Sequence, residues 1–111
     1  MAISFNDPEH EKLANDFRAL SKKYDKKGRK VAEELIATLD ILKAANSLFE
    51  VPRSYRPHPL KGDYKGYFAG DVTNTHRVIF KPNHKDDPNF RIDNYKSIVS
   101  IEIVEIYTDY H

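Results

Sequence analysis

The stretch YKGYFAGDVTNTHRVIFK, residues 64–81, contains two β-like segments separated by a compact polar turn. The first segment runs from about Tyr64 to Val72 and the second from His76 to Lys81. The turn between them, within Asp71–Thr75, is rich in residues that favour reversal of the chain. The two segments are therefore expected to pair as an antiparallel hairpin.

A third strand is expected after this hairpin, at about Ile98–Tyr107. Its apolar residues fall on both faces, which is typical of a central strand. The intervening segment Pro82–Asn94 is polar and contains Pro88. It is predicted to be a long and mobile loop.

Two helices are expected before the hairpin. Ile3–Phe5 is predicted to form a short edge strand, and Asp7 then has the character of a helix N-cap, followed by Pro8 at the first helical position. Apolar residues recur with helical spacing up to the stop signal around Gly28. These residues are Leu13, Phe17, Leu20 and Tyr24.

The second helix is expected from about Arg29 until Pro52 stops it. Its apolar stripe consists of Val31, Leu35, Leu39, Leu42 and Ala45. The short connection favours a helical hairpin. The sequence thus predicts a single α+β domain over residues 1–111, with an N-terminal helical hairpin packed on a small, mostly antiparallel β-sheet.

Composition excludes several classes of site. The sequence has no cysteine, which excludes disulfides, thiolate metal ligands and a cysteine nucleophile. It has no apolar run long enough to cross a bilayer, and its first residues lack the features of a signal peptide. We expect a cytoplasmic protein without a membrane partner.

Basic residues are concentrated in the middle of the chain. Residues 51–85 contain seven Lys/Arg and two Asp/Glu, a net charge of +5, whereas residues 1–50 are neutral and residues 86–111 carry −4. Aromatic residues lie among the cations, as in proteins that bind a polyanion and stack on its bases. An ordinary solvated surface with charges balanced in space explains the same pattern. Charge alone therefore does not distinguish a nucleic-acid-binding surface from an ordinary one.

Few residues in this region suggest chemistry by themselves. Arg77 lies inside the second β segment and points away from the side taken by Val78 and Phe80. A structural arginine there needs a carboxylate partner, whereas a functional one presents its guanidinium to a phosphate. His58 stands three residues before Lys61, and this spacing alone favours a structural role. No histidine pair or carboxylate set has metal-site spacing, so no metal is expected.

The last residues, Thr108-Asp109-Tyr110-His111, follow directly after the apolar strand. Terminal residues usually fray and have no role. Here, however, a histidine is expected to emerge from the middle of the sheet, and its unperturbed pKa suits proton transfer near neutral pH.

Three stretches together resemble the HigB toxins of the RelE/ParE superfamily of bacterial toxin–antitoxin systems. They are HPLKGDYKGYF at 58–68, HRVIF at 76–80 and DYH at 109–111. Since the helical hairpin also fits, the resemblance covers most of the chain. It implies a RelE-like fold and a ribosome-dependent endonuclease that cuts mRNA without a metal or organic cofactor.

The resemblance further implies a set of cleavage residues: His58, Lys61, Arg77, Asp109, Tyr110 and His111. Lys61 and Arg77 would stabilise charge on the phosphate. The two histidines would take the proton of the attacking 2′-hydroxyl and protonate the leaving 5′-oxygen, in either order. Tyr110 would stack on a base or act as an acid, and Asp109 would orient an imidazole. Further RNA contacts are expected from Arg56, Tyr64, Lys65 and Lys81.

The implied partners are mRNA on the ribosome and a helix-turn-helix antitoxin, with operator DNA contacted only through the antitoxin complex. The loop Pro82–Asn94 and the N-terminal helices look longer than is usual for the family, which would alter antitoxin contacts or ribosome docking. Two alternatives remain: a ParE-like gyrase poison without nuclease activity, and a noncatalytic nucleic-acid-binding module. The complete cleavage set argues against the first.

Overall fold

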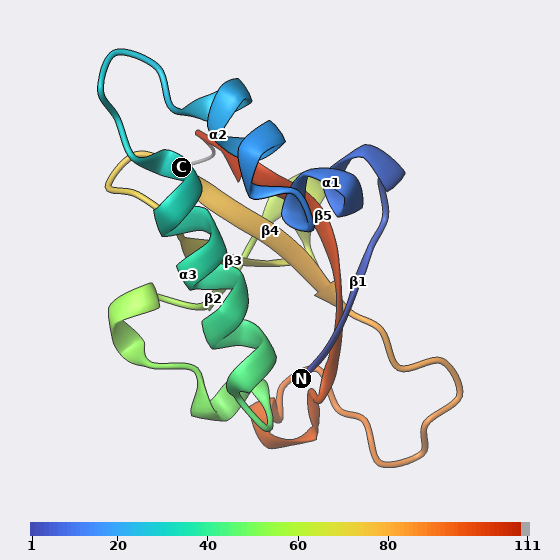
Figure 1. The fold of residues 1–111 in the computed structure, drawn as a ribbon. Coiled ribbons are helices and arrows are strands. Elements are labelled where there is room, and N and C mark those ends of the chain that lie inside the picture. Colours follow the sequence, from blue (N-terminus) through green and yellow to red (C-terminus); the bar gives the residue numbers. More distant parts are fainter. Residues whose placement is uncertain (110–111) are drawn as a thin grey trace.

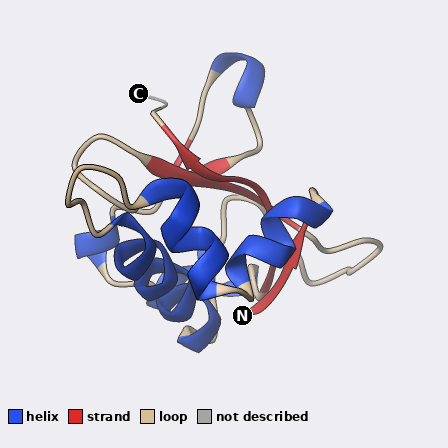
Figure 2. Ribbon diagram, turned by 45° about the horizontal axis from the view of Figure 1, so that its top comes forward, coloured by secondary structure: helices blue, strands red, loops and turns tan. Residues whose placement is uncertain are grey.

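The computed structural model describes residues 1–109, which form a five-stranded sheet with three α-helices on one face (Figures 1 and 2). In chain order the helices and strands are β1 (Ala2–Phe5), α1 (Pro8–Ala14), α2 (Phe17–Tyr24), α3 (Val31–Ala44), β2 (His58–Pro59), β3 (Phe68–Asp71), β4 (Arg77–Pro82) and β5 (Ser100–Thr108). Short 3-10 turns lie at η1 (Leu48–Glu50), η2 (Arg53–Tyr55), η3 (Gly62–Tyr64) and η4 (Tyr95–Ser97).

The sheet order is β1-β5-β4-β3-β2. β1 pairs with β5 in parallel, and the remaining pairs are antiparallel. The α+β class, the antiparallel β-hairpin and the N-terminal edge strand expected from the sequence are confirmed. The strand expected from Tyr64 begins only at Phe68, because the chain turns at η3 and at Gly66, whose φ is +93°. No helix among residues 1–109 is long and apolar enough to span a membrane.

The first predicted helix is two helices. The chain breaks after Ala14, and Asp16 caps α2 by accepting a hydrogen bond from Ala19 N at 3.1 Å. The break turns Phe17 outward, where it is 49% exposed, although sequence spacing placed it on the buried stripe. A continuous helix from Asp7 to Tyr24 was therefore the wrong prediction, because a side-chain cap within the segment competes with helix continuation.

The second predicted helix ends earlier than expected. α3 stops at Ala44, because Ala45 adopts an extended conformation and Leu48 N then donates a hydrogen bond to Ile98 O at 2.9 Å. Pro52 is therefore not the residue that ends it. The expected apolar stripe is nevertheless buried throughout. It packs in the main core with the inward residues of the sheet, namely Phe68, Val78, Phe80, Ile101, Ile103 and Ile106.

Asp25 links α2 to α3, and its ionisation can be tested. Its Oδ1 accepts a hydrogen bond from Ala32 N at 2.8 Å and its Oδ2 one from Ser21 Oγ at 2.7 Å. These bonds, first of all the one from Ala32, hold the pKa of Asp25 below its ordinary value of 3.8. A lowered pKa stabilises the folded state above pH 3.8, and this stabilisation is lost as the pH falls through the lowered value.

Asp25→Ala is therefore expected to lower the melting temperature at pH 7, and the gap to wild type should close as the pH falls below 3.8. Thermal melts over a pH series measure this. Asp40→Ala, on the exposed side of α3, serves as the matched control. A gap of constant size at all pH values would show that the carboxylate charge is not what stabilises the connection.

The long polar loop is present where the sequence predicted it and is anchored at both ends. His84 Nε2 accepts hydrogen bonds from Val99 N at 3.0 Å and Ser100 N at 3.2 Å. Its ring stacks on Phe90 with centroids 4.8 Å apart. Near η4, Ser97 Oγ donates to Arg91 O at 2.8 Å and accepts from Arg91 N at 2.9 Å. The loop therefore has a defined course beside β5; its predicted mobility stays a prediction.

Candidate functional site

The face of the sheet opposite the helices carries the predicted site. A small apolar cluster lies there, formed by Leu60, Ala69 and Ile79 with Tyr64, Tyr67 and Val104 packed against it. Because side chains alternate along a strand, Arg77 and Lys81 lie on the same side of β4 as Ile79. We call this surface the open face.

Arg77 has the carboxylate partner that a structural arginine requires. Its Nε lies 2.9 Å from Asp71 Oδ1, and its Nη1 donates to the carbonyls of Thr73 at 3.4 Å and His76 at 3.3 Å. The Asp71 contact is an ion pair without hydrogen-bond alignment, since Oδ1 accepts no hydrogen bond within residues 1–109. The Arg77 side chain is only 10% exposed. A role on phosphate therefore stays a prediction, and it would have to coexist with this ion pair.

Arg56 approaches the same carboxylate from the solvent side. Its Nε lies 3.8 Å from Asp71 Oδ2, and its side chain is 67% exposed. Asp71 thus lies between two guanidinium groups, one buried and one facing solvent. Asp71 was not among the predicted site residues, although the predicted hairpin already placed it near Arg77.

His58 has a defined tautomer. Its Nδ1 lies 2.6 Å from the carbonyl oxygen of Arg56. A carbonyl oxygen can only accept, so Nδ1 carries the proton, and in the neutral ring Nε2 is the basic atom. Arg56 reaches this position through a left-handed conformation with φ 48° and ψ 51°. The geometry therefore gives His58 the form that a general base needs.

Lys61, Lys65 and Lys81 differ in their surroundings. Lys61 and Lys65 are exposed on either side of η3, and neither forms an ion pair with any residue in the range 1–109. Lys81 Nζ lies 3.3 Å from Glu102 Oε1 and 5.8 Å from the ring centroid of Tyr67. Lys81 is thus partly neutralised, whereas the other two are open to an anion.

Tyr64 and Tyr67 form an aromatic pair over the open face. Their rings meet edge to face with centroids 5.6 Å apart. Tyr64 was a predicted RNA contact. Tyr67 was not, although its place among the basic residues of the middle segment was the signal for it.

The register of the sheet brings these residues together. Arg77 pairs with Asp71 on one side and Thr108 on the other, while His58 pairs with Ala69. With strands spaced ~4.8 Å and residues ~3.3 Å along a strand, the backbones of His58 and Arg77 are roughly 12 Å apart. That separation is short enough for both residues to serve one proposed phosphate site, provided the Arg77 guanidinium reaches it from its contact with Asp71.

The last strand, β5, brings Thr108 beside Arg77. Tyr107, one residue before Thr108, stacks on His76 with ring centroids 4.1 Å apart and 5° between the planes. It also meets Tyr24 edge to face at 5.0 Å. Asp109 is exposed. The predicted residues Tyr110 and His111 lie outside the described residues.

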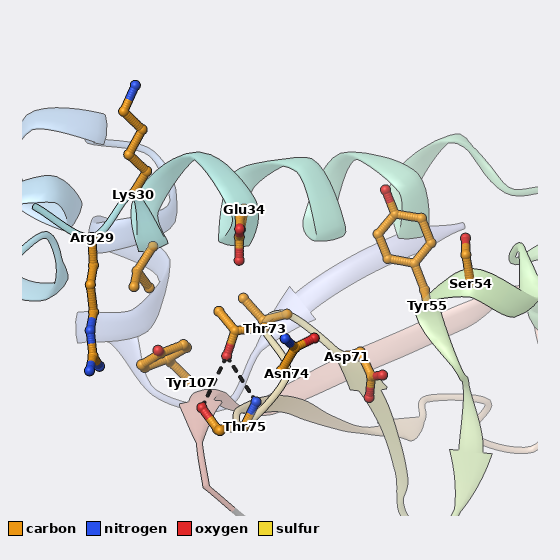
Figure 3. Close-up of a pocket in the computed structure, with 12 residues that line it drawn as sticks. Arg29, Lys30, Glu34, Ser54, Tyr55, Asp71, Thr73, Asn74, Thr75 and Tyr107 are labelled. Atoms are coloured by element: carbon orange, nitrogen blue, oxygen red, sulfur yellow. Dashed lines mark hydrogen bonds between the residues drawn. The ribbon is translucent and has the colours of Figure 1, made fainter.

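A polar cavity of about 550 Å³ adjoins this end of the sheet, below the start of α3 (Figure 3). Glu34 projects into it from α3 towards Thr73, and the Thr73 and Thr75 hydroxyl oxygens lie 3.4 Å apart on its floor. None of the predicted site residues within 1–109 lines the cavity. Also within that range, no three His, Asp or Glu side chains come together as a metal site would require.

Comparison with known proteins finds bacterial toxins both in a short sequence match and in the shared fold. No family model matches the sequence. A 27-residue segment is 48% identical to toxin YoeB of Streptomyces coelicolor and spans 24% of this chain and 32% of that protein, about a third of its length.

The fold, by contrast, is shared over the whole chain. A chain of the YoeB–YefM complex from Staphylococcus aureus superposes with a TM-score of 0.55 at 16% identity, covering 100% of this chain and 97% of that chain. Another structure of this pair is a heterotetrameric toxin–antitoxin complex. The YoeB/ParE toxin from Agrobacterium tumefaciens gives a TM-score of 0.53 at 14% identity, with 100% of both chains covered. This chain has the fold of these toxins. The RelE-like fold expected from the sequence is thereby confirmed.

Proposed function

We propose that this protein is the toxin of a type II toxin–antitoxin system, of the HigB kind, and that it cuts mRNA on the ribosome. The toxin fold supports the first part, and the basic, aromatic open face supports a single-stranded RNA substrate. The observation that carries the nuclease function is the His58 tautomer, because a protonated Nδ1 leaves Nε2 as a base, with the exposed Lys61 three residues further along the chain.

The proposed reaction uses only groups of the chain. His58 Nε2 takes the proton of the ribose 2′-hydroxyl, whose oxygen attacks the adjacent phosphorus. Lys61 and Arg77 stabilise the charge that builds on the phosphate oxygens. The bond to the 5′-oxygen breaks, leaving a 2′,3′-cyclic phosphate, and His111 donates the proton to the leaving oxygen. No metal or organic cofactor enters these steps.

The other members of the proposed set assist binding. Tyr110 stacks on a base next to the scissile phosphate, and Asp109 orients the imidazole of His111. Arg56, Tyr64, Lys65 and Lys81 hold the strand along the open face. Lys81 contributes less than Lys65 because Glu102 partly neutralises it.

The partner is proposed to be a helix-turn-helix antitoxin that binds the toxin, by analogy with the two YoeB–YefM structures. Contact with operator DNA only through the antitoxin complex is a further part of the proposal. The site of action would be the cytoplasm, where translating ribosomes are found. A gyrase poison has the same fold but no need of an oriented imidazole base, and a noncatalytic module needs none either.

Expression without a partner is expected to arrest growth and stop translation, with mRNA cut and DNA supercoiling unchanged. The measurement is mRNA integrity after incubation of the purified protein with and without ribosomes. Cutting only in the presence of ribosomes supports the proposal. Gyrase-linked DNA breaks with intact mRNA would establish the gyrase-directed alternative, and RNA binding without any cutting would establish the noncatalytic one.

A further inference from the structure

A groove of about 910 Å³ opens at one edge of the open face. It lies between η1, the segment after β2, and the end of the long loop with η4. Phe49, Ile92 and Tyr67 line it together with Leu60, Lys65 and Lys96. We call it the Phe49 groove. Of the predicted cleavage residues that the structure describes, namely His58, Lys61, Arg77 and Asp109, none lines it.

Two large apolar side chains in the lining of the groove are exposed to solvent. Phe49 is 61% exposed and Ile92 is 47% exposed. Adjacent exposed apolar side chains of this size mark a binding surface. The groove therefore needs an occupant with an apolar face.

Charge at the groove favours an anionic occupant. Lys96 Nζ lies 4.7 Å from the ring centroid of Phe49, and the exposed Lys65 also lines the groove. Asp93 is the one carboxylate among the described lining residues. A groove that holds an exposed aromatic ring and two ammonium groups suits a flat base attached to a phosphate chain.

The groove is continuous with the proposed cleavage site. Its lining includes Pro59, the residue after His58, and Leu60 and Tyr67 belong both to the groove and to the apolar cluster of the open face. An RNA strand with its scissile phosphate beside His58 and Lys61 can therefore extend along Leu60 and Tyr67 into the groove.

We propose that the Phe49 groove binds an unpaired base of the RNA strand next to the cleaved nucleotide, with Phe49 as the stacking surface and Lys65 and Lys96 holding the flanking phosphates. The inference rests on the proposed function for its substrate. It also gives the long loop a role, because Ile92 lies on its final part and Lys96 lies in η4, which follows it.

The probe for a test is a single-stranded RNA hexanucleotide with 2′-O-methyl groups, which binds but cannot be cleaved. Methyl NMR of the isoleucine-labelled protein reports its location. We expect the Ile92 methyl signal to shift on titration, while that of Ile36 on α3 stays in place. Phe49→Ala should weaken binding at least about fivefold, the low end for base stacking.

The chain offers matched controls. Phe17→Ala removes another exposed phenylalanine, on α2, and should leave binding unchanged. Lys65→Ala with Lys96→Ala should reduce the salt dependence of binding by the loss of up to two phosphate contacts, whereas Lys43→Ala on α3 should not. A hexanucleotide that leaves Ile92 unshifted overturns the inference, as does an Ile92 shift that grows with protein concentration alone, since a second copy then occupies the groove.

The ribosome assay separates the two proposals. If the wild type binds the probe at Ile92 yet leaves mRNA intact, the proposed function fails and the groove assignment stands. If the wild type cuts mRNA and Phe49→Ala cuts it with unchanged KM, the groove assignment fails and the function stands. A raised KM with nearly unchanged kcat for Phe49→Ala supports both.

Discussion

Replacing Arg77 by alanine is expected to slow mRNA cleavage by roughly 10²-fold or more, the scale of removing one transition-state donor. The structure adds an effect on stability. Arg77 and Asp71 are 10% and 19% exposed, so the substitution leaves a largely buried carboxylate without its nearer partner. This should lower the free energy of unfolding by on the order of 1–3 kcal/mol. Cleavage rates and thermal melts on the same samples measure both effects.

A second substitution separates the two effects. Adding Asp71→Asn to Arg77→Ala removes the unpaired charge, so the melting temperature should recover in part. Activity should stay low if the guanidinium acts on phosphate. Arg77→Lys should rescue activity only partly, because an ammonium lacks the bidentate geometry. Activity that returns together with the melting temperature would show that Arg77 serves only as the partner of Asp71.

The parts of the fold that sequence predicted are those set by local pattern. Asp71–Thr75 fixed the hairpin turn, and the spacing of Val31 to Ala45 identified the buried side of α3. Phe17 was misplaced because its spacing from Leu13 and Leu20 is that of one continuous helix. The only sign of the break was Asp16, since aspartate favours the N-cap position, but a cap inside an apolar stripe is hard to distinguish from an exposed helical residue.

The site was predictable where residues are close in sequence and less so where loops meet. The Arg77–Asp71 ion pair follows from hairpin register, which sequence indicated only approximately. The Phe49 groove depends on η1 contacting η4, which follows the long loop, and nothing in a polar loop sequence specifies that contact. The His58 tautomer likewise requires the left-handed turn at Arg56, a conformation that sequence favours mainly for glycine and asparagine.

Deleting Tyr110 and His111 is expected to abolish cleavage with little effect on folding. β5 ends at Thr108, and Ile106 is its last buried residue, so the deletion removes none of the described core. The free energy of unfolding should therefore change by no more than about half a kcal/mol. Loss of the proton donor should slow cleavage by roughly 10²- to 10⁴-fold. Loss of the Tyr110 ring should further weaken RNA binding by about 1–3 kcal/mol.

The position of Thr108 beside Arg77 is the reason to expect so large an effect from two residues. The stack of Tyr107 on His76 holds this end of β5 in place, so that Thr108 lies next to the proposed phosphate site. His111→Ala should reproduce the loss of rate with a nearly unchanged KM, whereas Tyr110→Phe keeps the ring and should retain binding. The test is to measure melting temperature, antitoxin binding and mRNA cleavage on one sample of the truncated protein. A truncated protein that melts normally and cuts at the wild-type rate would remove both residues from the mechanism and leave His58 without the proposed acid.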